Sequence, residues 1–183
     1  MRGPAGLILA VLSALTVACA TSFSPGAIRS EITRQTGSPP GDAFEVSVGE
    51  VTMSLAKALA ARSTEGGLPL QGLDRFELAV YPVPPGGSER LDFTKMAVRG
   101  WEPVVKVKKG PSSGFVLVRS ESGDSVGDLV VVAAGAQQVF YGRLRGRLPR
   151  ALPEALGEAV REGKPVNLLE SLQDVAKEPG QGQ

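Results

Sequence analysis

Four consecutive segments in the second half of the chain are rich in hydrophobic residues, and short turn-forming sequences separate them. Hydrophobic and polar residues alternate in the first and last segments, whereas the two middle segments are apolar at almost every position. A period of two is typical of β-strands, while Gly, Pro, Ser and Asp between the segments favour tight reversals. In the last segment Phe140, Leu144 and Leu148 fall on one face. We therefore predict an antiparallel meander with this face toward the core. The four predicted strands span residues 103–109, 115–120, 128–133 and 139–148.

Amphipathic helices and two further strands are predicted around this meander. Ser24 and Pro25 are typical of a helix start, and Gly37 is typical of its end. The whole pattern predicts an α+β fold with a mostly antiparallel sheet of about five to six strands and with the helices packed on one face. The other predicted elements are strands at 43–48 and 74–82 and helices at 50–62, between Gly87 and Gly100, after Pro153 and from Asn167.

Residues 1–20 have the pattern of a signal peptide. A positive charge at Arg2 precedes an apolar run over Leu7–Val17, which is too short to span a bilayer as a helix. Ala18 and Ala20 have the small-residue spacing that signal peptidase requires. We therefore predict a cut before Thr21.

An alternative processing route would lipidate Cys19. Residues 16–19 resemble a bacterial lipoprotein box, but the leucine of that box, Leu15, stands one place too early, so we favour the ordinary cut. We expect an exported protein, periplasmic or secreted, with a membrane-anchored lipoprotein as the alternative. Because Cys19 is the only cysteine, the mature domain must be stable without a disulfide. We predict a single domain over residues 21–178 and a disordered tail over 179–183.

Composition narrows the possible chemistry. The chain has 20 basic and 19 acidic residues, a net charge of +1, so we expect no nucleic-acid partner and contact with a membrane only through the signal peptide or a lipid anchor. It has no histidine, which excludes Ser-His-Asp catalysis and histidine-ligated zinc, copper and haem. It contains neither a P-loop nor a dinucleotide-binding glycine fingerprint. We predict no catalytic residue, no metal and no cofactor.

The sharpest candidate site lies on the last predicted strand. Strict alternation puts Tyr141, Arg143, Arg145 and Arg147 on the face opposite Phe140. A row of guanidinium groups can bind carboxylate, phosphate or a nucleic-acid backbone. The other interpretation, which we favour, is a solvated outer face whose arginines pair with acidic neighbours across the sheet, such as Glu77.

A second cluster contains only carboxylates. Glu121, Asp124 and Asp128 surround one predicted hairpin, where they could serve acid–base catalysis or hold calcium. Acidic residues at a turn usually provide local hydrogen bonds and solubility, and we favour that interpretation here.

Several short motifs resemble those of a bacterial family of exported proteins, domain-of-unknown-function family 4252, over roughly residues 25 to 165. The resemblance implies an exported α+β domain with no assigned reaction, so no site residue is transferred from the family. The motifs are the run Phe44–Gly49, the strand before Pro82, the segment Arg99–Val104, the strand Leu129–Ala133 and the corner Arg145–Leu148.

Two classes of function remain open. We favour a non-catalytic cell-envelope module that binds an envelope protein or a small anionic ligand through the sheet face with Tyr141 and the arginines, or through an exposed strand edge. The alternative is a histidine-free enzyme that uses carboxylates, such as a glycan-acting hydrolase. A purely structural role in the envelope is a minor third possibility.

Overall fold

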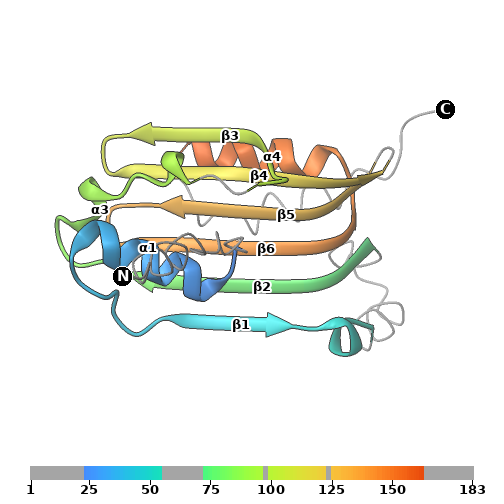
Figure 1. Ribbon diagram of the computed structural model, residues 1–183, viewed down its shortest axis with the longest axis horizontal. Helices are drawn as coiled ribbons and strands as arrows, with labels where there is room; N and C mark the ends of the chain where they lie inside the picture. Colours follow the sequence, from blue (N-terminus) through green and yellow to red (C-terminus); the bar gives the residue numbers. More distant parts are fainter. Residues whose placement is uncertain (1–22, 55–71, 97–98, 123–124, 163–183) are drawn as a thin grey trace, which may run out of the picture.

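The computed structural model describes residues 23–54, 72–96, 99–122 and 125–162. They form one six-stranded antiparallel sheet with the strand order β1-β2-β6-β5-β4-β3 (Figure 1). The predicted α+β class is confirmed, and the last four strands form the predicted meander. The strands are β1 (Phe44–Val48), β2 (Leu73–Pro82), β3 (Glu102–Lys109), β4 (Ser112–Ser122), β5 (Ser125–Ala134) and β6 (Gln138–Leu148). The helices are α1 (Pro25–Thr36), α3 (Gly87–Arg90), η2 (Phe93–Lys95) and α4 (Ala151–Arg161).

Helices cover both faces of the sheet, whereas the sequence pattern predicted one covered face. On one side Ile28 and Ile32 of α1 pack with Phe115 and other strand residues. On the other side Leu156 of α4 packs with Leu129 and its neighbours. The physical reason is visible in β5, which is apolar and buried at every position from residue 129 to residue 134. Because successive strand residues point to opposite faces, such a strand needs cover on both.

The predicted register of β6 is confirmed on its apolar side. Leu144 and Leu148 are buried in the cluster beneath α4, and Phe140 packs against the same cluster. The strand was predicted to present these three side chains to one core, and it does so.

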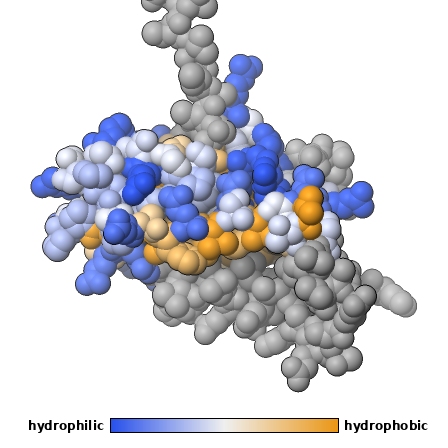
Figure 2. Space-filling model, turned by 90° about the horizontal axis from the view of Figure 1, so that it is seen from below, coloured by the Kyte–Doolittle hydropathy of each residue, from blue (hydrophilic) through white to orange (hydrophobic). Residues whose placement is uncertain are grey.

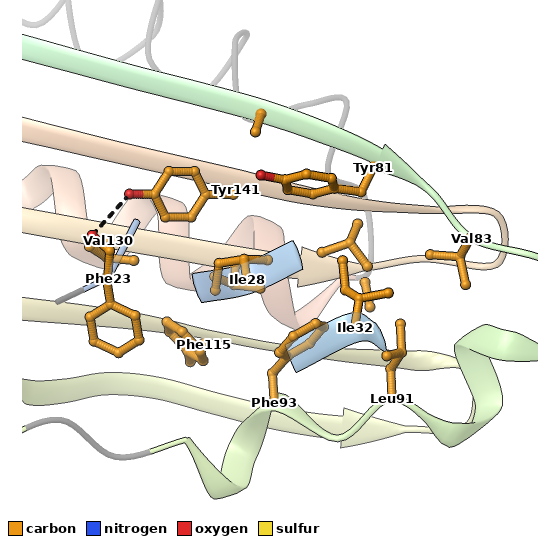
Figure 3. Packing of buried hydrophobic residues seen from close by; sticks show 14 of the residues in the cluster. Phe23, Ile28, Ile32, Tyr81, Val83, Leu91, Phe93, Phe115, Val130 and Tyr141 are labelled. Carbon is orange, nitrogen blue, oxygen red and sulfur yellow. Dashed lines mark hydrogen bonds between the residues drawn. The ribbon is translucent and has the colours of Figure 1, made fainter. Parts of the chain in front are cut away.

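Helix α1 has the predicted ends. The Ser24 hydroxyl accepts a hydrogen bond from the Ala27 backbone N–H at 3.2 Å, and Pro25 occupies the first helical position. Gly37 ends the helix with a φ of 78°, a conformation that glycine adopts without a steric cost. Phe23, just before the helix, is buried against the sheet, as Figure 3 shows.

The segment before Trp101 was predicted as one amphipathic helix, and this prediction is wrong. Its described residues form the short helix α3, two non-helical residues, Leu91 and Asp92, and the 3₁₀ turn η2. Side chains from other elements bind its backbone here: Lys108 Nζ donates to the Leu91 carbonyl oxygen at 2.8 Å, and Ser113 Oγ accepts from the Phe93 N–H at 2.8 Å. These tertiary hydrogen bonds replace those that a continuous helix would make.

Other predictions extend beyond the described residues. The helix predicted at 50–62 is helical over residues 50–54, where the description stops. The signal peptide, Cys19, the helix from Asn167 and the tail at 179–183 all lie outside the described residues. Within the part of the chain that is described, no helix combines the length and the apolar character that crossing a membrane requires.

Candidate functional site

The four candidate residues of β6 differ sharply in exposure. Tyr141 is fully buried, and Arg143 is only 6% exposed. Arg145 is half-buried and Arg147 is exposed. The predicted row of guanidinium groups therefore begins inside the protein and ends at its surface. The interpretation of this face as fully solvated is wrong for Tyr141 and Arg143.

Asp128 of β5 is the centre of this arrangement. Its carboxylate is buried and forms a two-point ion pair with Arg143, with Nε at 2.9 Å from Oδ1 and Nη2 at 2.7 Å from Oδ2. Arg119 of β4 donates to the same Oδ2 at 2.8 Å. Arg145 Nε lies 3.4 Å from Oδ2, a distance at which charge attracts but geometry gives no hydrogen bond. One carboxylate thus gathers three arginines from two neighbouring strands.

The buried charge of Arg143 is compensated on several sides. Its Nη1 donates to the carbonyl oxygen of Phe23 at 2.8 Å, and its guanidinium lies 5.7 Å from the centre of the Trp101 ring. Burial lowers the pKa of Arg143, but the hydrogen bonds and negative charge of Asp128 outweigh burial, so the pKa is raised overall. Arg143 therefore stays charged.

Trp101 connects the buried and exposed arginines. Besides Arg143, the Arg119 guanidinium lies 5.3 Å from the centre of its ring, and Phe23 meets the ring edge to face at 5.3 Å between centroids. Cations above an aromatic face are attracted by its negative potential. Trp101 thus packs against the core and also contacts Arg119.

The Tyr141 hydroxyl is part of the same polar network. It lies 3.2 Å from Glu77 Oε2 and 3.4 Å from the Phe23 carbonyl oxygen, the contact drawn in Figure 3. Burial raises the pKa of Tyr141, and the negative charge of Glu77 raises it further. Glu77, predicted as an acidic neighbour across the sheet, lies opposite Arg143 in the strand register. Tyr141 and Arg143 therefore fasten the segment before α1 to the sheet.

Strand pairing becomes irregular just beyond this network. Gly146 and Arg147 of β6 together face the single residue Gly127 of β5, and Asp74 of β2 is an extra residue opposite β6. Gly146 has a φ of 138° and approaches the Gly72 carbonyl so closely that no side chain fits. Such bulges bend strands and redirect side chains, and they are common beside functional sites.

A surface hollow of about 460 Å³ lies at these bulges. We call it the arginine hollow, because four arginines from three strands line it. Asp128 forms part of its wall but is already paired with Arg143, so positive charge exceeds negative charge there. The lining residues are Glu50, Asp74, Arg75, Arg119, Gly127, Asp128, Arg145, Gly146 and Arg147.

Sequence reasoning found Arg145 and Arg147 of this hollow but missed Arg75 and Arg119. It also grouped Asp128 with Glu121 and Asp124 as carboxylates around a hairpin, whereas the structure buries Asp128 inside the sheet. A signal was present: Arg119 is a single charge at the end of one apolar run, and Asp128 a single charge at the start of the next. The hairpin register places these two residues directly opposite each other.

The carboxylate cluster predicted around the hairpin is not described as a whole. The side chains of Glu121 and Asp124 lie outside the described part, and within that part no three Asp, Glu, His or Cys residues gather as they would around a metal. The arginine hollow does contain carboxylates, but both oxygens of Asp128 accept hydrogen bonds from arginine. A carboxylate enzyme at this place would therefore depend on Glu50 and Asp74.

Comparisons with protein-family models, with curated proteins and with solved structures gave no match. The resemblance to family 4252 therefore stays a prediction from the short motifs.

Proposed function

We propose that the protein is an exported, non-catalytic binding module that holds a small anionic ligand in the arginine hollow. The observation that carries this proposal is the surplus of arginine. Arg75, Arg119, Arg145 and Arg147 line the hollow together with three carboxylates, those of Glu50, Asp74 and Asp128, and Asp128 also neutralises Arg143, a fifth arginine. An excess of positive charge in a concave site favours the binding of an anion.

The ligand should carry a carboxylate or a phosphate. Guanidinium groups bind both in a planar, two-point geometry. Asp128 holds Arg119 and Arg145 in place before any ligand arrives, which lowers the entropy cost of binding. Arg145 Nε is buried and makes no hydrogen bond within the described residues, so it is a donor that a ligand oxygen could satisfy. Arg75 and Arg147 add exposed charge at the rim.

Export is the second part of the proposal. Its support is the signal-peptide pattern of residues 1–20 and the position of Phe23, which is buried in the core only two residues after the predicted start at Thr21. The mass of the intact mature protein from its native host tests this part. A mass that begins at Thr21 supports the ordinary cut, a mass with lipid at Cys19 supports the anchored form, and an uncut chain contradicts export.

Trp101 is the only tryptophan, and it contacts Arg119 in the wall of the hollow, so its fluorescence should report binding. We suggest titrating the protein at low salt with inorganic phosphate and with succinate as a dicarboxylate. We expect saturable binding of at least one of them that weakens with added salt. If neither binds, the proposed site is refuted.

Variants then locate the site. Arg147→Glu and Arg145→Glu should weaken binding by about tenfold or more, since a hydrogen bond to a charged group contributes about 1.5–3 kcal/mol. The matched control is Lys109→Glu, which makes the same charge change at an exposed position on β3, the far edge strand. An equal loss in the control would show that binding follows net charge and does not need the hollow. A collapse of the melting temperature in Arg145→Glu would instead assign this arginine a structural role.

A further inference from the structure

The sheet has two edge strands, β1 and β3, and within the described residues only β3 carries features that prevent another strand from pairing with it. The edge strand β3 carries Pro103, which cannot donate a backbone hydrogen bond, and several lysines. Two of these lysines bind neighbouring backbone, with Lys106 Nζ at 2.9 Å from the Thr94 carbonyl oxygen and Lys108 Nζ at 2.8 Å from that of Leu91. Proline and lysine are the usual devices that stop another strand from adding to an edge.

The other edge strand, β1, has none of these devices. It has five residues and contains no proline, lysine or arginine. Its single charge, Glu45, turns toward its own sheet, where its carboxylate lies 3.1 Å from the Tyr81 hydroxyl. In the part of the chain that the structure describes, β1 therefore pairs only with β2, and its other edge is open.

Exposed hydrophobic side chains lie at both ends of this strand. Phe44, its first residue, is 60% exposed, and Val51, three residues beyond its end in the helical stretch 50–54, is 86% exposed. Among the described residues these are the large hydrophobic side chains most open to water. Seen from the β1 side, Figure 2 shows hydrophobic surface running as a band along this edge. Hydrophobic surface on an open edge favours association.

We infer that β1 pairs with β1 of a second copy of the chain, antiparallel about a two-fold axis at Val46. The axis is perpendicular to the sheet. The two sheets therefore join into one continuous sheet, and corresponding faces of the two copies lie on the same side of it. The exposed Phe44 of each copy then lies opposite the half-buried Val48 of the other, and the two side chains form a cross-strand contact. The pairing also satisfies backbone groups at both edges.

The strand's own sequence selects this axis. With the axis at Val46, Glu45 lies opposite Ser47 of the second copy, and no like charges meet. An axis at Glu45 would place two carboxylates opposite each other, which is unfavourable. An axis at Ser47 would move Phe44 beyond the end of the paired strand. Only the axis at Val46 pairs all five residues.

The contact is small, because stable dimers usually bury about 1,200–2,000 Å² and a short strand edge contributes only part of that. We therefore expect a reversible dimer that dissociates on dilution. Sedimentation velocity across a range of protein concentrations measures this directly. A chain that stays monomeric at every concentration overturns the proposal.

Two lysine variants test the register. Val46→Lys places two lysines opposite each other and should weaken association by about tenfold or more. Ser47→Lys adds the same charge one residue later, opposite Glu45 of the second copy, and should strengthen association. Both positions lie at the surface edge, so folding should be retained, and circular dichroism verifies this. If both lysine variants weaken association equally, the effect comes from general charge repulsion, and the proposed register is wrong.

Disulfide trapping gives an independent measurement. In a Cys19→Ser background, Val46→Cys should form a covalent dimer on mild oxidation, because symmetric partners at the axis have Cβ atoms about 4.5–5.5 Å apart. Phe44→Cys is the matched control, since the two copies of residue 44 lie at opposite ends of the paired strands and cannot join. Equal trapping of both variants would contradict the axis.

Amide hydrogen exchange distinguishes two possible causes of protection at β1: pairing with a second copy, and cover by another segment of the same chain. Protection of β1 that rises with protein concentration supports the dimer. Protection that is strong and independent of concentration in a monomeric protein means that the chain covers its own edge, and the inference is then wrong.

Discussion

Replacing Asp128 with asparagine removes the negative charge that binds Arg143 while keeping the shape of the side chain. The side chain of Arg143 is only 7% exposed, so water cannot replace the lost partner. Removing one member of a buried ion pair costs about 3–5 kcal/mol. For a domain of this size each kcal/mol corresponds to about 2–4 °C, which gives a fall in melting temperature of about 6–20 °C.

Urea denaturation followed by circular dichroism measures this change. Arg119→Ala is the control, because its side chain contacts the same carboxylate but is 51% exposed. Its loss should cost about 1 kcal/mol or less. The double variant Asp128→Asn with Arg143→Met removes both buried charges and should recover much of the stability.

The reasoning fails if Asp128→Asn costs less than about 1 kcal/mol, or if the double variant is as unstable as the sum of the single ones. Either result would mean that the arginine network is solvated and contributes nothing specific to the fold.

Two further predictions concern the buried tyrosines and two glycines. Burial, reinforced by Glu45 for Tyr81 and by Glu77 for Tyr141, raises both tyrosine pKa values above the ordinary 10.0, so the folded state holds these protons more tightly than the unfolded state. The stability that this difference provides is complete below pH 10.0 and is lost as the pH rises further. Phenolate absorbance should therefore appear in the same pH range as the unfolding that circular dichroism detects. Ionisation of the tyrosines before unfolding would contradict their burial. Gly114→Ala should lower the free energy of unfolding by about 1–3 kcal/mol, because its Cβ would lie 2.4 Å from the Val132 carbonyl oxygen. Gly26→Ala in α1 places a Cβ with no atom within 4 Å and should raise the free energy of unfolding by about 0.4–1 kcal/mol. Urea denaturation measures both variants, and changes of the same sign in the two would refute this prediction.

Local sequence determined the strands and the first helix. Alternation along residues 139–148 predicted which side of β6 enters the α4-side core, and Leu144 and Leu148 lie there. The cap at Ser24 and the stop at Gly37 predicted α1, because capping depends on residues within one turn of the helix end. Signals of this kind need no knowledge of distant neighbours.

Tertiary structure decided the rest. Strict alternation treats Arg143, Arg145 and Arg147 as equivalent. In the structure the first is buried and donates to the Phe23 carbonyl oxygen, whereas the last is exposed at the bulge beside Gly146. The role of Asp128 depends on which residues of β4 and β6 lie beside it, and that register is set by the whole sheet. Burial and pairing are properties of elements brought together, so the arginine hollow exists only in the assembled fold.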